Sequence, residues 1–392
     1  SLSLSLSLSL SLSLSLSLSL SLSLSHSLTL SLSHSLTLAN KQIKPNAPVG
    51  ITNPIALWGQ ISKLGWLAVA IQDDYGVSCV IFRYLAVLIE AMGGVCLPVP
   101  FFSTVVVSAA TLEQSSASDL KTNLLPRITA GELVCSYAVT EPGNTYGLVN
   151  IQTQAVPDGE GFSINGSKLF VEYARSADYL LTVVHEGKDL LILMVDSSSP
   201  GVEIESYDTL DYADQCEVCF NDVKVPVSSV VARGGEATTL LKNLEERSAV
   251  GKCAEILGGI QVVLDMSVDY VKDREQFGQV VGSFQAIQHH CANMAVEVDS
   301  CRSITKQAIW KIAQGLPATK EVSMAKSYTS AAAIRVTKLG HQTHGAISFC
   351  DELDMHLYLR KAHAASVAFG DEEYHLELSL IHISEPTRRT PI

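Results

Sequence analysis

The stretch 273–289 places polar side chains between two segments that both have helical patterns. Glycines at 278 and 282 interrupt the pattern, which predicts a short connection followed by a helix start. Three side chains project from this connection, namely Arg274, Gln276 and Gln285. A guanidinium offers a planar fork of donors that matches a pyrophosphate, which a lysine would contact only as a point charge. The alternative is a solvated, charged turn in a helical hairpin.

The elements that must position these side chains follow a three-part pattern. Helical periodicity runs from residue 54 to about 128, and from about 135 the period changes to two, with turn formers such as Asn165-Gly166 between short strands. Long helices return from about 239 to 378. This order predicts an α+β architecture. We expect an N-terminal helical domain over 53–134, a small middle β-barrel or sandwich over 135–232 and a C-terminal four-helix bundle over 238–378.

The two ends of the chain differ in character from the rest. Residues 1–40 are a low-complexity tract dominated by Ser-Leu alternation, which a translated CT dinucleotide repeat would produce. The tract lacks the basic start of a signal peptide and the continuous apolar run of a membrane helix, so no membrane span is expected. Residues 381–392 resemble translated sequencing adapter, a probable non-native tail. We expect the N-terminal helical domain to be truncated, with the repeat preceding it directly.

Charge and cysteine content exclude several classes of function. The net charge is −13 and Lys and Arg are scattered, which argues against nucleic-acid binding. Nine cysteines occur without a disulfide-like rhythm, which favours a reducing compartment, and we expect a bacterial-type cytoplasmic protein. Cys216 and Cys219 lie in a predicted strand and would point to opposite faces, so no metal site is expected there.

Four motifs resemble those of the acyl-CoA dehydrogenase family, FAD-dependent flavoenzymes that desaturate acyl thioesters. They are Arg-Glu-Gln-Phe-Gly at 274–278, Tyr-Ala-Val-Thr-Glu-Pro-Gly at 137–143, Asn-Gly-Ser-Lys-Leu-Phe-Val at 165–171 and Gln-Thr-His-Gly at 342–345. The pattern is most similar to that of members acting on bulky or branched acyl-CoAs. The resemblance implies that Arg274 reaches across a subunit interface to the pyrophosphate of a neighbour's FAD. A homo- or hetero-oligomer, dimer or tetramer, follows from this.

The resemblance also implies a set of residues that bind FAD. These are Tyr137, Val139, Thr140, Phe170, Arg274, Phe277, Gln285, Gln342 and Gly345. The chain departs from the family at Glu172, where Thr or Ser usually contacts the flavin, and at Tyr146, where a small hydroxyl is usual. A carboxylate facing the flavin ring would disfavour the anionic reduced flavin, so Glu172 is expected either to be protonated or to point elsewhere.

The implied reaction requires a carboxylate that removes the substrate α-proton. In many members this glutamate follows the Gln-x-x-Gly-Gly loop, which begins at Gln342 here, and the matching position is Phe369. On a continuous helix Glu373 would lie one turn further along the same face, and Asp371 would point nearly opposite. A second group in the family carries the glutamate on an earlier helix, just before an Arg. That pattern makes Glu246 the candidate base, with Glu245 in reserve, against the alternative of solvated surface charge.

The resemblance therefore implies an FAD-dependent acyl-CoA dehydrogenase that catalyses α,β-desaturation. The hydride would pass to flavin N5 and the electrons to an electron-transfer flavoprotein. One alternative is a non-catalytic subunit that completes a partner's FAD site, which Phe369, Glu172 and Tyr146 motivate. Another is an acyl-CoA oxidase, which shares every motif.

Overall fold

The computed structural model describes residues 54–69, 71, 78–143, 146–147 and 151–381 of the 392-residue chain. The Ser-Leu tract over 1–40, and with it the expected truncation, lies outside the described residues. The expected non-native tail does too, apart from its first residue, Ile381.

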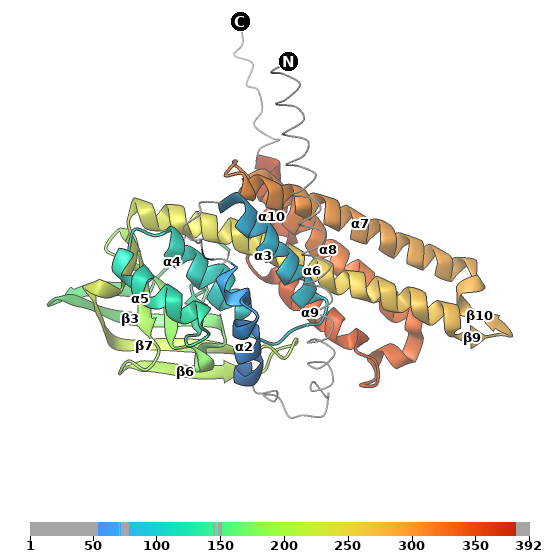
Figure 1. Ribbon diagram of the computed structural model, residues 1–392, viewed down its shortest axis with the longest axis horizontal. Coiled ribbons are helices and arrows are strands. Elements are labelled where there is room, and N and C mark those ends of the chain that lie inside the picture. The colour runs from blue at the N-terminus through green and yellow to red at the C-terminus, as the bar shows by residue number, and fades with distance from the viewer. Residues whose placement is uncertain (1–53, 70, 72–77, 144–145, 148–150, 382–392) are drawn as a thin grey trace, which may run out of the picture. The chain divides into compact units, whose positions relative to one another are not determined.

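Helices precede the sheet along the chain (Figure 1). They are α2 (Pro54–Lys63), α3 (Ser78–Gly93), the π-helical segment η2 (Phe102–Ala109), α4 (Ala110–Gln114) and α5 (Ser118–Thr129). The end of α3 packs closely on the later helix α6 (Gly235–Asp273). A Cβ atom on Gly93 would lie 2.0 Å from the carbonyl oxygen of Glu255, and one on Gly258 would lie 1.8 Å from that of Glu90. The two helices thus touch backbone to backbone, which only glycine permits.

The middle of the chain forms one eight-stranded sheet in which most neighbours are antiparallel. Its strands are β1 (Cys135–Ala138), β2 (Gln154–Asp158), β3 (Gly161–Glu172), β4 (Tyr179–Glu186), β5 (Asp189–Asp196), β6 (Val202–Tyr207), β7 (Gln215–Pro226) and β8 (Val230–Arg233). The order is β6-β7-β3-β2-β4-β5-β8, and β1 pairs in parallel with β4. Val218 of β7 and Leu191 of β5 share one buried cluster although their strands are not neighbours, so the sheet curls around its own core.

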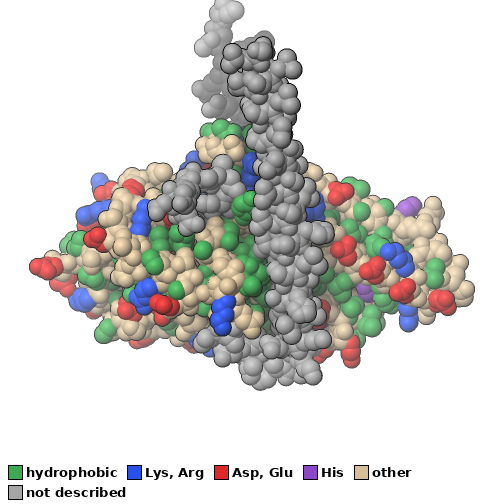
Figure 2. Space-filling model, in the orientation of Figure 1, with side chains coloured by type: hydrophobic (Ala, Val, Ile, Leu, Met, Phe, Trp, Pro, Cys, Tyr) green, Lys and Arg blue, Asp and Glu red, His purple; other side chains and the backbone are tan. Residues whose placement is uncertain are grey.

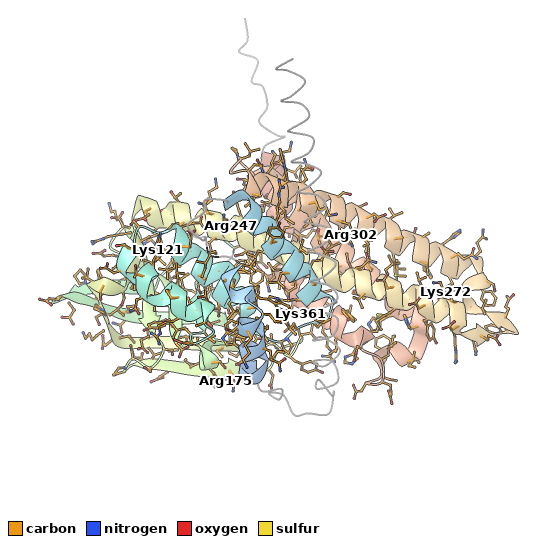
Figure 3. All side chains as sticks on the ribbon, viewed as in Figure 1. Lys121, Arg175, Arg247, Lys272, Arg302 and Lys361 are labelled. Carbon is orange, nitrogen blue, oxygen red and sulfur yellow. The ribbon has the colours of Figure 1, made fainter. Side chains whose placement is uncertain are left out.

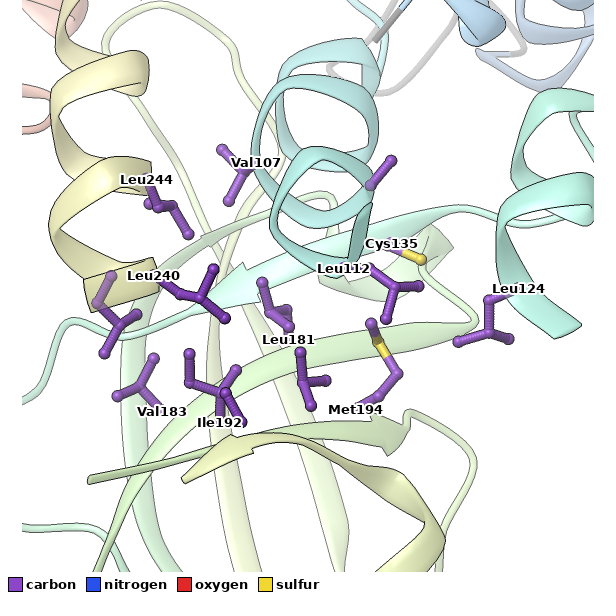
Figure 4. Packing of buried hydrophobic residues seen from close by; sticks show 14 of the residues in the cluster. Val107, Leu112, Leu124, Cys135, Leu181, Val183, Ile192, Met194, Leu240 and Leu244 are labelled. Carbon is purple, nitrogen blue, oxygen red and sulfur yellow. The ribbon is translucent and has the colours of Figure 1, made fainter. Parts of the chain in front are cut away.

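The opposite face of β4 and β5 packs against helices. Leu181 and Ile192 on this face contact a cluster that includes Leu112 of α4, Leu124 of α5 and Leu240 of α6 (Figure 4). Alternation along each strand therefore divides its apolar side chains between two cores. Continuous apolar stretches such as 190–195 result, because both faces of these strands are buried.

The C-terminal region is a helical bundle. Besides α6 it contains α7 (Gln285–Ala313), α8 (Thr319–His344), α9 (Met355–Val367) and α10 (Glu372–Ile381). Helix α6 has 39 residues, a length of about 58 Å, and packs against both the sheet and the other helices of the bundle. Its first turns pack on the sheet through Leu240 and Leu244, whereas Ile260 and Val263 pack in the bundle core.

The predicted order of helices, sheet and helical bundle is confirmed as an α+β fold. The change of period from 3.6 to two and back indicates it correctly because that change reflects which side chains are buried. Among the described residues, no helix combines the length and apolar character that crossing a bilayer requires.

Candidate active site

A cavity of about 1460 Å³ lies where the sheet meets the bundle. Its walls come from β1, β3, the β6–β7 loop, α6, α8 and the segment around α10. Pockets for one small ligand usually enclose about 300–1,000 Å³, so this cavity is large enough for a cofactor together with a substrate. Four of the expected cofactor residues line it, namely Tyr137, Val139, Thr140 and Phe170.

A buried ion pair holds the β1 end of this wall in place. The Lys168 Nζ lies 2.6 Å from Glu141 Oε1 and donates a second hydrogen bond of 3.2 Å to the carbonyl of Val139. The backbone N–H of Leu169 donates to the carbonyl of Thr140 at 2.8 Å. Burial alone would raise the pKa of Glu141, but Lys168 outweighs it and the pKa is lowered. Residues 168–169 of β3 are thus hydrogen-bonded to the backbone carbonyls of Val139 and Thr140, and both segments line the cavity.

Phe170 faces the cavity because β3 is irregular at this point. The pairing of β3 with β7 shifts register between Lys168 and Val171, which is typical of a bulge. Phe170 has a φ of 56°, an outlier for a bulky residue, and its side chain is 59% exposed. Its ring lies 6.0 Å from that of Tyr207, another residue of the cavity wall. The chain accepts a strained backbone here and presents an aromatic ring to the cavity.

Glu172 lines the cavity and is turned toward a buried group of charges. Its Oε1 lies 3.8 Å from the Nζ of Lys252, which also lies 2.9 Å from Glu255 Oε2. The Nζ of Lys361, a residue labelled in Figure 3, lies in the same group of charges. It is 3.5 Å from a carboxylate oxygen of Glu255 and 3.5 Å from one of Asp211. Burial alone would lower the pKa of Lys252, but Glu172 and Glu255 outweigh it and the pKa is raised. The charge of Glu172 is therefore opposed by a buried ammonium, a partner that the sequence did not indicate.

Both candidate base residues lie at the cavity, about three turns from the start of α6. Glu246 Oε1 accepts a hydrogen bond of 2.5 Å from the hydroxyl of Thr319, the first residue of α8. Burial, reinforced by the neighbouring charge of Glu246, raises the pKa of Glu245 to about 7. Burial, and then the charge of Glu245, raises the pKa of Tyr137 on the same cavity wall.

The segment around Phe369 differs from the expected continuous helix. Helix α9 ends at Val367 and α10 begins at Glu372, while Phe369 and Gly370 have φ angles of 54° and 101°. The expectation that Glu373 lies one helical turn beyond Phe369 is therefore wrong. Asp371 instead accepts a hydrogen bond of 2.9 Å from the backbone N–H of Tyr374 and caps the start of α10.

Phe369 occupies the position at which the sequence resemblance implies a base in many family members. Its ring lies 5.7 Å from Phe102 and stacks at 6.5 Å on Tyr137. Tyr146 stands where the resemblance implies a small hydroxyl residue. The centre of its ring lies 5.4 Å from that of Tyr374, and both residues line the cavity. These aromatic rings make this part of the wall apolar, in keeping with the raised pKa of Glu245.

The remaining expected cofactor residues lie at the opposite end of the bundle. They are Arg274, Phe277, Gln285, Gln342 and Gly345, all exposed. Arg274 follows α6 directly and precedes the hairpin of β9 (Glu275–Gln276) and β10 (Gln279–Val280), which lies at the bundle end (Figures 1 and 3). The ring of Tyr270 lies 4.5 Å from that of His344, so the ends of α6 and α8 are neighbours.

The hairpin presents an aromatic ring to solvent. Phe277 and Gly278 form its two-residue turn with φ angles of 56° and 76°, as in a type I′ turn. Asn or Asp would be usual at the first position, yet a phenylalanine occupies it with 92% of its surface exposed. In a single chain, neither Phe277 nor Arg274 is part of the cavity wall formed by the described residues.

The sequence did not indicate several residues of the inner cavity wall. Thr319 and Ser323 of α8 and His375 of α10 line it together with Glu246. The His375 Nε2 lies 2.8 Å from the carbonyl of Phe369, and burial lowers the pKa of this histidine to about 4. No local pattern distinguishes them, because α8 and α10 meet only in the folded bundle.

Charges on the surface are mixed. Figure 2 shows Lys and Arg side chains interspersed with Asp and Glu on one face of the molecule. Such a surface matches the scattered basic residues of the sequence.

Comparison with known proteins identifies three matching domains in chain order. Sequence models match at residues 37–132 (acyl-CoA dehydrogenase, N-terminal domain), 136–223 (middle domain) and 241–382 (C-terminal domain). A probable acyl-CoA dehydrogenase of Bacillus subtilis, YngJ, is 28% identical over 351 residues, which cover 86% of this chain and 92% of the relative. The short/branched chain specific acyl-CoA dehydrogenase of Rattus norvegicus is 25% identical over 329 residues, covering 81% and 76%. The structure of acyl-CoA dehydrogenase from Geobacillus kaustophilus has the same fold, with a TM-score of 0.82 at 23% identity, covering 91% and 97%.

Proposed function

This chain belongs to the acyl-CoA dehydrogenase family, whose members are FAD-dependent oxidoreductases, and on that premise we propose that it desaturates a short branched acyl-CoA between Cα and Cβ. The observation that carries the proposal is Glu245. It lies at a cavity of about 1460 Å³, and its pKa of about 7 suits a general base at neutral pH.

The residues of the cavity fit the ring system of FAD. The exposed ring of Phe170 offers an aromatic surface for an isoalloxazine. The backbone of Val139 and Thr140, which is held by hydrogen bonds from Lys168 and Leu169, offers polar groups. When bound, FAD supplies the acceptor for the substrate β-hydride. Tyr137 completes this wall of the flavin site.

The pyrophosphate of FAD needs cations that the described cavity wall does not offer. Eight carboxylate side chains and a single lysine, Lys242, are among its described residues. We infer that Arg274 of a second copy binds the pyrophosphate, with Phe277, Gln285, Gln342 and Gly345 of that copy around the adenylate part. The exposed ring of Phe277 in a left-handed turn supports this role, because solvent exposure alone gives no reason to keep phenylalanine there.

We propose that Glu245, and not Glu246, is the base that removes the α-proton of the substrate. Glu246 already accepts a hydrogen bond from Thr319, whereas burial keeps Glu245 basic enough to take a proton near pH 7. Transfer of the Cα proton to the Glu245 carboxylate accompanies departure of the β-hydride. The rings of Phe369, Phe102 and Tyr137 make part of the cavity wall apolar, and burial raises the pKa of Glu245.

The test follows the visible absorption band of the flavin. FAD-loaded protein is mixed anaerobically with straight and branched saturated acyl-CoAs, and substrates are expected to bleach the band. Glu245→Gln should slow bleaching by roughly 10²–10⁴-fold, the range for loss of a general base. The matched variant Glu246→Gln should slow it less. Bound flavin that no thioester bleaches would contradict the proposed activity, and a larger effect of Glu246→Gln would move the base to that residue.

Two alternatives concern the fate of the electrons and the partner chain. We propose electron-transfer flavoprotein as acceptor, and faster reoxidation of the reduced protein by oxygen than by that flavoprotein would instead indicate an oxidase. The other alternative is a non-catalytic subunit of a heteromer. It is favoured by Phe369, which cannot act as a base at the position where the resemblance implies one. That alternative predicts no bound flavin until another chain is co-expressed.

A further inference from the structure

Five charged side chains form a row at one part of the cavity wall. The Oε1 of Glu172 on β3 lies 3.8 Å from the Nζ of Lys252 on α6, which lies 2.9 Å from Oε2 of Glu255. The Oε1 of Glu255 lies 3.5 Å from the Nζ of Lys361 on α9, which lies 3.5 Å from Oδ2 of Asp211. The row therefore alternates in sign and has a carboxylate at each end.

The two acidic ends of this row are its members at the cavity. Glu172 and Asp211 belong to the described cavity wall, whereas Lys252, Glu255 and Lys361 do not. The side chain of Lys252 is only 5% exposed, whereas that of Glu172 is 28% exposed. A negative charge therefore lies at the cavity surface, and the ammonium that is paired with it lies inside the protein.

A structural role for the row does not require Glu172. Lys252 has a closer carboxylate partner in Glu255, and its Nζ lies 4.0 Å from the centre of the Phe102 ring, so other groups already stabilise this ammonium. The 3.8 Å between Glu172 and Lys252 is longer than a hydrogen bond. A loosely paired carboxylate on a cavity wall retains much of its effect on what the cavity holds.

We propose that the carboxylate of Glu172 lowers the reduction potential of FAD in this cavity. The inference rests on the proposed function, in which the exposed ring of Phe170 is part of the flavin site. Phe170 precedes Glu172 by two residues on β3, and both line the cavity. The β-hydride of the substrate brings one negative charge to this site. A carboxylate on the same wall repels that charge and so disfavours the reduced state.

A lower potential changes the driving force of each half of the reaction. At equilibrium with a given mixture of saturated and unsaturated thioesters, less of the flavin is reduced. Transfer of the electrons onward to an acceptor becomes more favourable by the same free energy. Glu172 therefore shifts driving force from the oxidation of the substrate to the reoxidation of the flavin.

The test measures the midpoint potential of the FAD-loaded protein against a reference dye, by anaerobic photoreduction without any thioester. Glu172→Gln keeps the size of the side chain and removes its charge, and Lys252 keeps Glu255 as a partner. The variant is expected to shift the ratio of reduced to oxidised flavin upward by roughly tenfold, as Coulomb's law gives for one unit charge in a partly buried site. Tenfold corresponds to a rise of about 30 mV for a two-electron couple. An unchanged potential would overturn the proposal.

Two further variants separate charge from packing. Glu172→Asp shortens the side chain but retains the carboxylate, so it should keep most of the low potential. Glu203→Gln removes an exposed carboxylate of β6 that is not part of the described cavity wall, and it should keep the potential of the unaltered protein. If Glu172→Asp raised the potential as much as Glu172→Gln, packing and not charge would cause the shift. An equal rise in Glu203→Gln would show that the position at the cavity does not matter.

The measurement is independent of the desaturase activity because no substrate is present. A raised potential in Glu172→Gln, combined with no bleaching by any thioester, would retain the role of Glu172 and remove the proposed activity. Bleaching by a branched acyl-CoA, combined with equal potentials, would retain the desaturase and remove the role of Glu172. Protein that takes up no FAD would overturn both.

Discussion

Among single residues, the half-buried carboxylate of Glu245 governs the proposed chemistry. Glu245 and Glu246 are neighbours in sequence, and both reach the same cavity. Only Glu245 has its pKa raised to about 7, by burial first and by the charge of Glu246 second. A residue that must be ionised to accept a proton thus titrates in the physiological range, with consequences for both rate and stability.

The rate of flavin reduction should follow the ionisation of Glu245. Because the carboxylate form is the base, the rate at saturating acyl-CoA is expected to rise with pH up to about 7 and to level off above it. Stopped-flow measurement of bleaching between pH 5.5 and 8.5 checks this. A rate that does not change with pH across 7 would argue against Glu245 as the base.

Burial of Glu245 should also make stability depend on pH. Its pKa is raised from 4.5 to about 7, so stability is lost as pH rises between these values, where the unfolded chain ionises first. Glu245→Gln removes the ionisable group and should gain roughly 2–3 kcal/mol over the unaltered protein at pH 8, with no gain near pH 4. Denaturant unfolding at both pH values measures the difference. An equal effect at both would show that packing, not charge, dominates.

At the scale of elements, two local devices hold the cavity walls. One is the turn between α9 and α10, where Lys326 donates hydrogen bonds of 2.8–3.1 Å to the carbonyls of Ala365, Ser366 and Gly370. The other is the buried pair of Glu141 and Lys168 between β1 and β3. Each fixes backbone that faces the cavity, so each can be tested through stability and flavin binding together.

Gly370→Ala should damage the α9–α10 turn. Gly370 has a φ of 101°, and an added Cβ would lie 2.4 Å from the Nε2 of His375. The control is Gly187→Ala, where φ is 62° but the space is open. We expect the control to lose about 1 kcal/mol of unfolding free energy and Gly370→Ala to lose about 3 kcal/mol or more. Equal losses would mean that the turn adjusts without cost.

Lys168→Met should destabilise the sheet by roughly 3–5 kcal/mol, because it leaves the carboxylate of Glu141 buried without its cation. The double variant Glu141→Leu, Lys168→Met removes both charges and should recover much of that loss. Thermal unfolding and FAD affinity are measured for both. If the double variant regains stability but not FAD affinity, the ion pair has two roles. It stabilises the sheet, and it also positions the backbone of Val139 and Thr140 for FAD.

At the scale of the whole molecule, the expected FAD residues fall into two groups at opposite ends of the bundle. Tyr137, Val139, Thr140 and Phe170 line the cavity, whereas the group with Arg274 is exposed beyond it. A closed, two-fold assembly would bring the second group of one copy to the cavity of another.

Complementation between inactive subunits tests this assembly. Arg274→Gln and Glu245→Gln should each lack activity alone. In a mixed dimer, the site with an intact Glu245 receives the intact Arg274 of its partner, so random mixing should restore about a quarter of all sites. Flavin bleaching in co-expressed and separately purified proteins measures this. No recovery in verified mixed oligomers would place Arg274 at a site within its own chain.

The order of helices, strands and helices could be predicted from local residue patterns, because burial imposes periods of 3.6 and two on them. The sequence also indicated the cavity residues Tyr137, Thr140 and Phe170, whose motifs are contiguous in the chain. Three features depend on the folded chain: Glu172 faces Lys252, Phe369 is not helical, and the pKa of Glu245 is raised. Desolvation and Coulomb interactions act through space between segments far apart in sequence, so no local pattern records them.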